Sequence, residues 1–185
     1  MTDLHSRTAL PPALRVLAET LPRADWEAHA NFDGLTRFWM NRHLMFREVL
    51  DRMRTGTEAR LDQGLDPQRH AAETQRYASF FLNELHGHHM IEDQHYFPQL
   101  MRLDKRLEAG FQLLDADHHA LDADLHALAE TVNGYLQGWS APDAQDRAGA
   151  LLTHLQGFGV FLDRHLTDEE DLIVPIILTH APDMH

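Results

Sequence analysis

The chain has 185 residues, which is enough for one domain with a sizeable hydrophobic core. It contains no cysteine, which excludes disulfides, cysteine nucleophiles and thiolate metal sites, so any metal ion must be held by nitrogen and oxygen atoms. The formal net charge of -13 at pH 7 disfavours nucleic acids and anionic membrane surfaces as partners, whereas it suits cations.

The sequence has no apolar stretch that approaches the roughly twenty residues needed for a membrane-spanning helix. Its first twelve residues are MTDLHSRTALPP, which lack the basic start and the apolar stretch of a secretory signal peptide. We therefore expect a cytoplasmic protein that does not bind membranes.

Helical periodicity dominates the chain, because apolar residues recur every three or four positions. Residues 1–24 are predicted to form an N-terminal extension with a short helical segment between Pro12 and Pro22. A first long helix is expected from about Trp26 to the region of Gly56. Its apolar side is formed by Phe32, Leu35, Trp39, Phe46, Leu50 and Met53.

Capping residues and prolines mark three more helices. Asp66 and Pro67 resemble an N-cap followed by proline at the first helical position, and the stretch WSAPD gives the last helix a similar start. This last helix is expected to be perturbed near Pro175. Four long helices with short connections predict an all-α fold, an up-down-up-down four-helix bundle over residues 25–180. In chain order, the helices are expected over about residues 26–56, 67–103, 105–135 and 142–179.

Residues 86–98 have the sequence HGHHMIEDQHYFP, with four histidines and two acids. Neutral imidazole and carboxylate are the ligands that iron, zinc and manganese take in the absence of cysteine. A solvated helix face is the alternative explanation. A single histidine followed four residues later by an acid is weak evidence, because a chain with 15 histidines and 29 acidic residues contains such pairs by chance.

An internal repeat favours the metal site. At an offset of 77 residues, His88 and Glu92 fall on His165 and Glu169, and each glutamate is followed six residues later by proline. Residues four apart share one face of a helix. Each pair therefore offers one nitrogen and one carboxylate side by side.

The helices that precede these pairs also repeat. His43 and His118 lie 75 residues apart, and each is followed at three, seven and ten residues by apolar side chains. The repeat also favours His88 as a ligand over the adjacent His89, because His89 corresponds to Leu166 in the second half. We therefore predict that His89 is not a ligand.

In an antiparallel bundle, the rise of about 1.5 Å per residue brings the four repeated histidines into one layer. Six ligands of this kind are too many for one tetrahedral zinc ion, and they suit two metal ions with bridging carboxylates. The predicted ligands are His43, His88, Glu92, His118, His165 and Glu169.

This pattern, with its two prolines, resembles the hemerythrin-like, or HHE, cation-binding proteins over roughly residues 30–180. The resemblance implies a four-helix bundle with two iron ions, bridged by an oxo or hydroxo group, in which the four histidines are terminal ligands and the two glutamates are bridges. The oxygen-carrying hemerythrins of marine worms have a fifth histidine one turn after the third-helix ligand. Asp122 stands at that position here, so either Asp122 binds metal or the site is open or filled by water there.

Two iron ions with several imidazoles and an apolar surround bind dioxygen or nitric oxide, or react with peroxide. The first hypothesis is a protein that binds, stores or senses oxygen, another diatomic ligand or iron. The second is a di-iron enzyme: an oxidase, a peroxidase or a protein that handles nitric oxide, including one that serves iron-sulfur repair. The third is a metal-free helical interaction module. The oligomeric state stays open.

Overall fold

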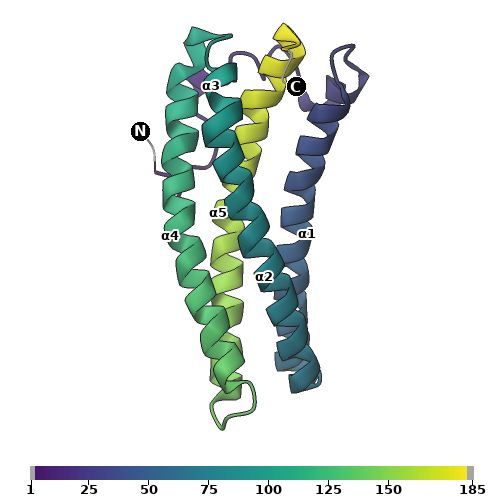
Figure 1. Cartoon of the computed structure of the whole chain (residues 1–185), viewed down its shortest axis with the longest axis vertical. Coiled ribbons are helices and arrows are strands. Elements are labelled where there is room, and N and C mark those ends of the chain that lie inside the picture. The colour runs from purple at the N-terminus through teal and green to yellow at the C-terminus, as the bar shows by residue number, and fades with distance from the viewer. Residues whose placement is uncertain (1–2, 183–185) are drawn as a thin grey trace. The chain divides into compact units, whose positions relative to one another are not determined.

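The structure is a computed structural model that describes residues 3–182, and within that range it contains helices and connecting segments but no β-strand. This confirms the predicted all-α fold. None of the helices in these residues is long and apolar enough to cross a membrane. The α-helices, labelled in Figure 1, are α1 (Gly34–Asp62), α2 (Pro67–Ile91), α3 (Phe97–Leu100), α4 (Glu108–Gly138) and α5 (Ala144–His180).

The chain divides into two compact units, and each unit takes segments from the four long helices α1, α2, α4 and α5. All six predicted metal ligands lie in the first unit. Unit 1 comprises Met1–Leu44, His88–Ala120 and Asp163–His185, and unit 2 comprises Met45–Gly87 and Leu121–Leu162.

The first long helix begins later than predicted. Arg23–Ala28, which includes Trp26, forms a 3-10 helix, and α1 starts only at Gly34. The cause is a capping residue that the sequence analysis passed over. The carboxylate of Asp33 accepts a hydrogen bond from the backbone N–H of Thr36 at 2.8 Å, as an N-cap side chain does.

The same helix also ends later than predicted, because Gly56 does not interrupt it. The helix continues to Asp62 and stops before Gly64, whose φ of 67° lies in the left-handed region that glycine adopts without steric cost. The predicted start of the next helix is confirmed. Asp66 accepts a hydrogen bond of 2.7 Å from the N–H three residues later, and Pro67 is the first residue of α2.

The second predicted helix is not continuous, which corrects the sequence prediction. Glu92–Tyr96 forms a π-helix between α2 and α3, in which the N–H of Phe97 donates to the carbonyl of Glu92 five residues earlier. Pro98 follows directly and has no N–H with which to continue the α-helical pattern. Helix α5, by contrast, runs through Pro175. Single π-turns inside helices often occur at functional sites, and this one begins at a predicted ligand.

The N-terminal extension packs into the core of unit 1. Leu10, Leu14 and Trp26 are buried in the same hydrophobic cluster as Phe111 of α4 and Ile173 of α5. Burial of each such side chain stabilises a fold by about 1.5–3 kcal/mol. The extension is therefore an integral layer of this unit.

Unit 2 has an aromatic core of its own. The ring of Phe81 packs edge to face against Phe46 and Phe158, with centroid distances of 6.2 Å and 5.9 Å. Edge-to-face packing is a favoured geometry for aromatic pairs. Phe81 and Phe158 are partners in the 77-residue repeat, so both halves of the chain contribute the same position to this core.

Candidate metal centre

The six predicted ligands converge in unit 1, where they form two groups of buried side chains together with one further histidine. Within each group, the potential ligand atoms all lie within 4.8 Å of one another. We name them the His43 group and the His89 group. The His43 group consists of His43, His88, Glu92 and Glu169, and the His89 group consists of His89, His118 and His165.

The presence of His89 corrects a sequence prediction. Its side chain is buried, and its ring stacks on that of His118 with a centroid distance of 4.1 Å and an interplanar angle of 12°. The comparison of the two halves had set His89 aside because Leu166 stands at the corresponding position. Consecutive residues of a helix diverge by about 100°, and a site with two adjacent groups of ligands is wide enough to receive both His88 and His89.

The carboxylate of Glu92 connects the two groups. Its Oε1 lies 3.0 Å from Nε2 of His88, and its Oε2 lies 3.8 Å from Nε2 of His118. The indole Nε1 of Trp39 donates a hydrogen bond of 2.6 Å to Oε1. Complete burial and the nearby carboxylate of Glu169 raise the pKa of Glu92 well above its ordinary value. A cation at this position would favour the charged form instead.

Glu169 has the equivalent position from the other half of the repeat. Its Oε2 lies 3.4 Å from Nε2 of His165 and 3.7 Å from Nε2 of His43. Like Glu92, it therefore contacts one histidine from each group. Two carboxylates placed in this way can each bridge a pair of metal ions.

A second shell of carboxylates contacts the far nitrogen of the ligand histidines. Nδ1 of His118 lies 2.7 Å from Oδ1 of Asp93, and Nδ1 of His43 lies 3.0 Å from Oε1 of Glu170. Such contacts fix the tautomer and the orientation of a histidine and leave Nε2 for the metal. The sequence analysis missed both acids, although Asp93 and Glu170 obey the same 77-residue offset as the ligands.

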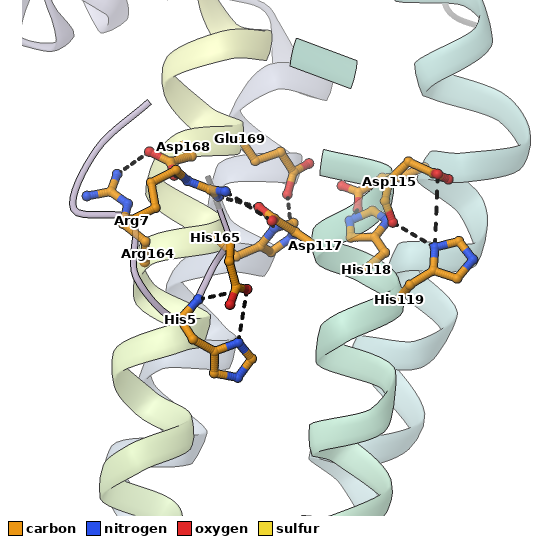
Figure 2. A network of polar contacts seen from close by, with 12 residues as sticks. His5, Arg7, Asp115, Asp117, His118, His119, Arg164, His165, Asp168 and Glu169 are labelled. Atoms are coloured by element: carbon orange, nitrogen blue, oxygen red, sulfur yellow. Dashed lines mark hydrogen bonds and ion pairs between the residues drawn. The ribbon is translucent and has the colours of Figure 1, made fainter. Parts of the chain in front are cut away.

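A third acid, Asp117, contacts Nδ1 of His165 at 3.5 Å through its Oδ2 (Figure 2). The guanidinium of Arg7 contacts both carboxylate oxygens of Asp117, and Nε of Arg7 donates to Asp168 at 2.7 Å. Burial acts to raise the pKa of Asp117, but its contacts with His165 and Arg7 hold that pKa below the ordinary value. Asp117 is therefore a charged acceptor for the ligand histidine.

Four buried ligand atoms have no hydrogen-bond partner among the residues that the structure describes: Nε2 of His89, His118 and His165, and Oε2 of Glu92. Buried polar atoms are almost always paired, because desolvation without compensation is costly. Burial and nearby histidines lower the pKa of His89 well below its ordinary value, which keeps its imidazole neutral, as metal binding requires. The donor set therefore fits metal ions.

Asp122 lies in unit 2 and belongs to neither group of ligand atoms found among the described residues. Its side chain is 49% exposed, and its Oδ1 lies 3.5 Å from Nδ1 of His86 in the same unit. The idea that Asp122 binds metal stays a prediction, and its contact with His86 offers an alternative role.

A small apolar cavity lies beside Glu92. Its volume is about 20 Å³, and its walls include Trp39, Tyr96, Ile173 and Ile177. A cavity needs about 10–15 Å³ to hold one water molecule. The space next to this carboxylate is therefore sized for a molecule of two or three atoms.

The family model described as hemerythrin HHE cation binding domain matches residues 34–177. The matched span contains all members of the His43 and His89 groups, whereas the N-terminal extension lies outside it. No curated protein and no solved structure matches the chain.

Proposed function

Since the chain belongs to the hemerythrin HHE cation-binding domain family, we propose that unit 1 holds two iron ions and binds dioxygen or another diatomic ligand for storage or sensing. Three histidines would hold one ion, two histidines would hold the other, and two glutamates would bridge them. The proposed ligands are His89, His118 and His165 for the first ion, His43 and His88 for the second, and Glu92 and Glu169 as bridges.

The observation that carries this proposal is the set of buried ligand atoms without hydrogen-bond partners among the described residues. Nε2 of His89, His118 and His165 lie within 4.8 Å of one another, and all three lack such a partner. Three imidazole nitrogens that converge in this way would be costly in a metal-free helical module. A metal ion compensates all three at once.

The donor set favours two iron ions over one zinc ion. A structural zinc site is closed by four tetrahedral ligands, whereas seven ligands of mixed imidazole and carboxylate type suit two ions with higher coordination numbers. Bound iron would supply redox chemistry and a coordination position for a diatomic ligand. The chain's own residues would orient the ligands and restrict access to this position.

The apolar cavity supports a small, neutral ligand. Trp39, Tyr96, Ile173 and Ile177 present mainly carbon surface beside Glu92, and the volume of about 20 Å³ excludes large substrates. Dioxygen and nitric oxide fit both restrictions. Glu92 is the only carboxylate in the wall of this cavity as described, and the proposed bridging role occupies it.

The test is metal analysis followed by optical spectroscopy. Protein purified without chelator should contain about two irons per chain, and chelation should lower its unfolding temperature, because a metal bound only by the folded state stabilises that state. A His95→Ala variant, altered at an exposed position, should retain its iron. A single zinc ion per chain would contradict the proposal.

Exposure of the anaerobically reduced protein to dioxygen separates binding from catalysis. We expect a stable adduct that is reversed when oxygen is removed. Rapid oxidation with turnover of a reductant or of peroxide would favour the di-iron enzyme instead.

A further inference from the structure

The N-terminal extension reaches the proposed metal centre although it lies outside the matched family domain. Two of its arginines, Arg7 and Arg23, each contact a carboxylate that in turn contacts a ligand histidine. These carboxylates are Asp117 and Glu170. Both chains of contacts lie wholly within unit 1.

The first chain of contacts joins Arg7 to His165 through Asp117 (Figure 2). Nη1 and Nη2 of Arg7 donate to the two oxygens of Asp117, with a distance of 3.1 Å for the Nη1 contact. Oδ2 of Asp117 also contacts Nδ1 of His165. The Arg7 side chain is only 2% exposed, and Asp168 accepts a further hydrogen bond from its Nε. A two-pronged contact of this kind fixes the carboxylate plane as well as its charge.

The second chain of contacts joins Arg23 to His43 through Glu170. Nη1 of Arg23 contacts Oε2 of Glu170, while Oε1 of the same carboxylate lies 3.0 Å from Nδ1 of His43. Nη2 of Arg23 donates to Asp171 at 2.7 Å. The Arg23 side chain is 43% exposed, so solvent screens this ion pair more than the one formed by Arg7.

The two contacts act on different parts of the centre. His165 belongs to the His89 group and His43 to the His43 group, so the extension touches one ligand in each. A carboxylate on Nδ1 orients the imidazole and raises its basicity. An arginine on that carboxylate limits its rotation and withdraws part of its negative charge, which sets how strongly the histidine donates to the metal.

We propose that Arg7 and Arg23 are positioning residues of the metal centre, which act through Asp117 on His165 and through Glu170 on His43. The extension thereby completes the second shell of a site whose ligands all come from the family domain. This inference rests on the proposed metal centre. It differs from the simpler role of anchoring the extension, which the experiment must separate from it.

Arg164 provides the matched control. Its Nη1 donates to the carbonyl of Thr8 at 2.7 Å, and its Nη2 contacts Asp168, the residue that also accepts from Arg7. None of these contacts involves Asp117. Arg164→Met therefore weakens the attachment of the extension while the carboxylate on His165 keeps its partner.

The experiment titrates metal-depleted protein with Co²⁺, whose visible absorption reports the geometry of its ligands. Arg7→Met should weaken Co²⁺ binding by about 10 to 100-fold and alter the spectrum, as loss of a second-shell partner typically does. Arg23→Met should have a smaller effect in the same direction, because Arg23 is more exposed. Arg164→Met should retain the wild-type spectrum and affinity.

A double variant tests whether Arg7 acts through Asp117. In an Asp117→Asn background, the further change Arg7→Met should alter Co²⁺ affinity much less than it does in the wild type, because coupled residues are not additive. Equal effects in the two backgrounds would overturn the proposed route.

Arg7→Lys keeps the test decisive if Arg7→Met does not fold, which circular dichroism will show. Lysine retains the charge but cannot make the two-pronged contact, so a folded variant with intermediate affinity and an altered spectrum is expected. Wild-type affinity and spectrum in both Arg7→Lys and Arg23→Met would overturn the positioning role. Absence of Co²⁺ binding by the wild-type chain would overturn the metal centre itself, a distinguishable result.

Discussion

The indole Nε1 of Trp39 donates a hydrogen bond of 2.6 Å to Oε1 of Glu92, between two side chains that are both buried in unit 1. The same oxygen lies 3.0 Å from Nε2 of His88. Trp39 also forms part of the wall of the small cavity beside Glu92. One tryptophan therefore orients a proposed bridging carboxylate and shapes the space next to it.

Trp39→Phe should disturb the metal centre while it preserves most of the packing. Phenylalanine keeps an aromatic ring but removes the N–H, so Glu92 loses a neutral donor within its buried environment. We expect iron affinity to fall by about tenfold and the optical spectrum of the loaded protein to change. Trp26→Phe is the control, because Nε1 of Trp26 donates to the carbonyl of Leu21, away from the ligands. An unchanged spectrum in Trp39→Phe would contradict the orienting role.

His89→Ala should remove metal about as effectively as His88→Ala. The repeat alone predicts a loss from His88→Ala only, whereas the structure places both side chains in the ligand groups. Metal analysis of the two variants distinguishes these expectations, with the exposed His95→Ala as a control. Full metal content in His89→Ala would restore the original six-ligand set.

The repeat explains which ligands could be predicted from the sequence. It identified residues that both halves share, because a duplicated pair stands out among many histidines and acids. His89 has no counterpart, since Leu166 stands at the matching position, and no periodic signal marks it. Asp93 and Glu170 were within reach of the same comparison, because their offset is also 77 residues.

The contacts of the N-terminal extension could not be predicted in this way. Arg7 and Asp117 lie 110 positions apart, and Arg23 and Glu170 lie 147 positions apart, so only the folded chain brings them together. The π-helix has a clearer local cause. Pro98 removes a backbone donor, but its equivalent Pro175 lies within an uninterrupted α5, so the proline alone does not decide the outcome.

His70 should make the stability of unit 2 depend on pH. Its Nδ1 lies 2.5 Å from the hydroxyl of Tyr135 and its Nε2 lies 3.2 Å from that of Thr57, while burial and the charge of Arg60 lower its pKa below the ordinary value of 6.5. A histidine with a depressed folded-state pKa contributes stability above pH 6.5 that is lost as pH falls toward the folded-state value.

The substitution His70→Gln should therefore reduce the loss of unfolding free energy on acidification below pH 6.5. Urea unfolding of both proteins over a pH series measures this difference. His126→Gln, at a 78% exposed side chain of the same unit, is the control and should leave the pH dependence unchanged. Identical pH profiles for His70→Gln and the wild type would show that His70 is not held neutral by the fold.

Glu92→Gln should have opposite effects on the metal-free and the metal-loaded protein. Without metal, burial and the adjacent Glu169 raise the pKa of Glu92 well above its ordinary value of 4.5. The unfolded chain therefore releases this proton at a lower pH than the folded chain does. In the window between the two pKa values, folded-state stability falls by up to about 1.4 kcal/mol for each pH unit of increase.

Glutamine has nearly the same shape and does not titrate, so this loss disappears in the metal-free variant. Its stability relative to the metal-free wild type should increase as pH rises above 4.5, and urea unfolding in the presence of chelator measures the trend. With metal, the order reverses, because a neutral amide is a weaker ligand than a carboxylate and the variant gains less stability from binding. Glu19→Gln, at an exposed position of unit 1, should show neither effect. If metal-free Glu92→Gln were less stable than the wild type by the same amount at every pH, the buried carboxylate would carry no cost that a metal must offset.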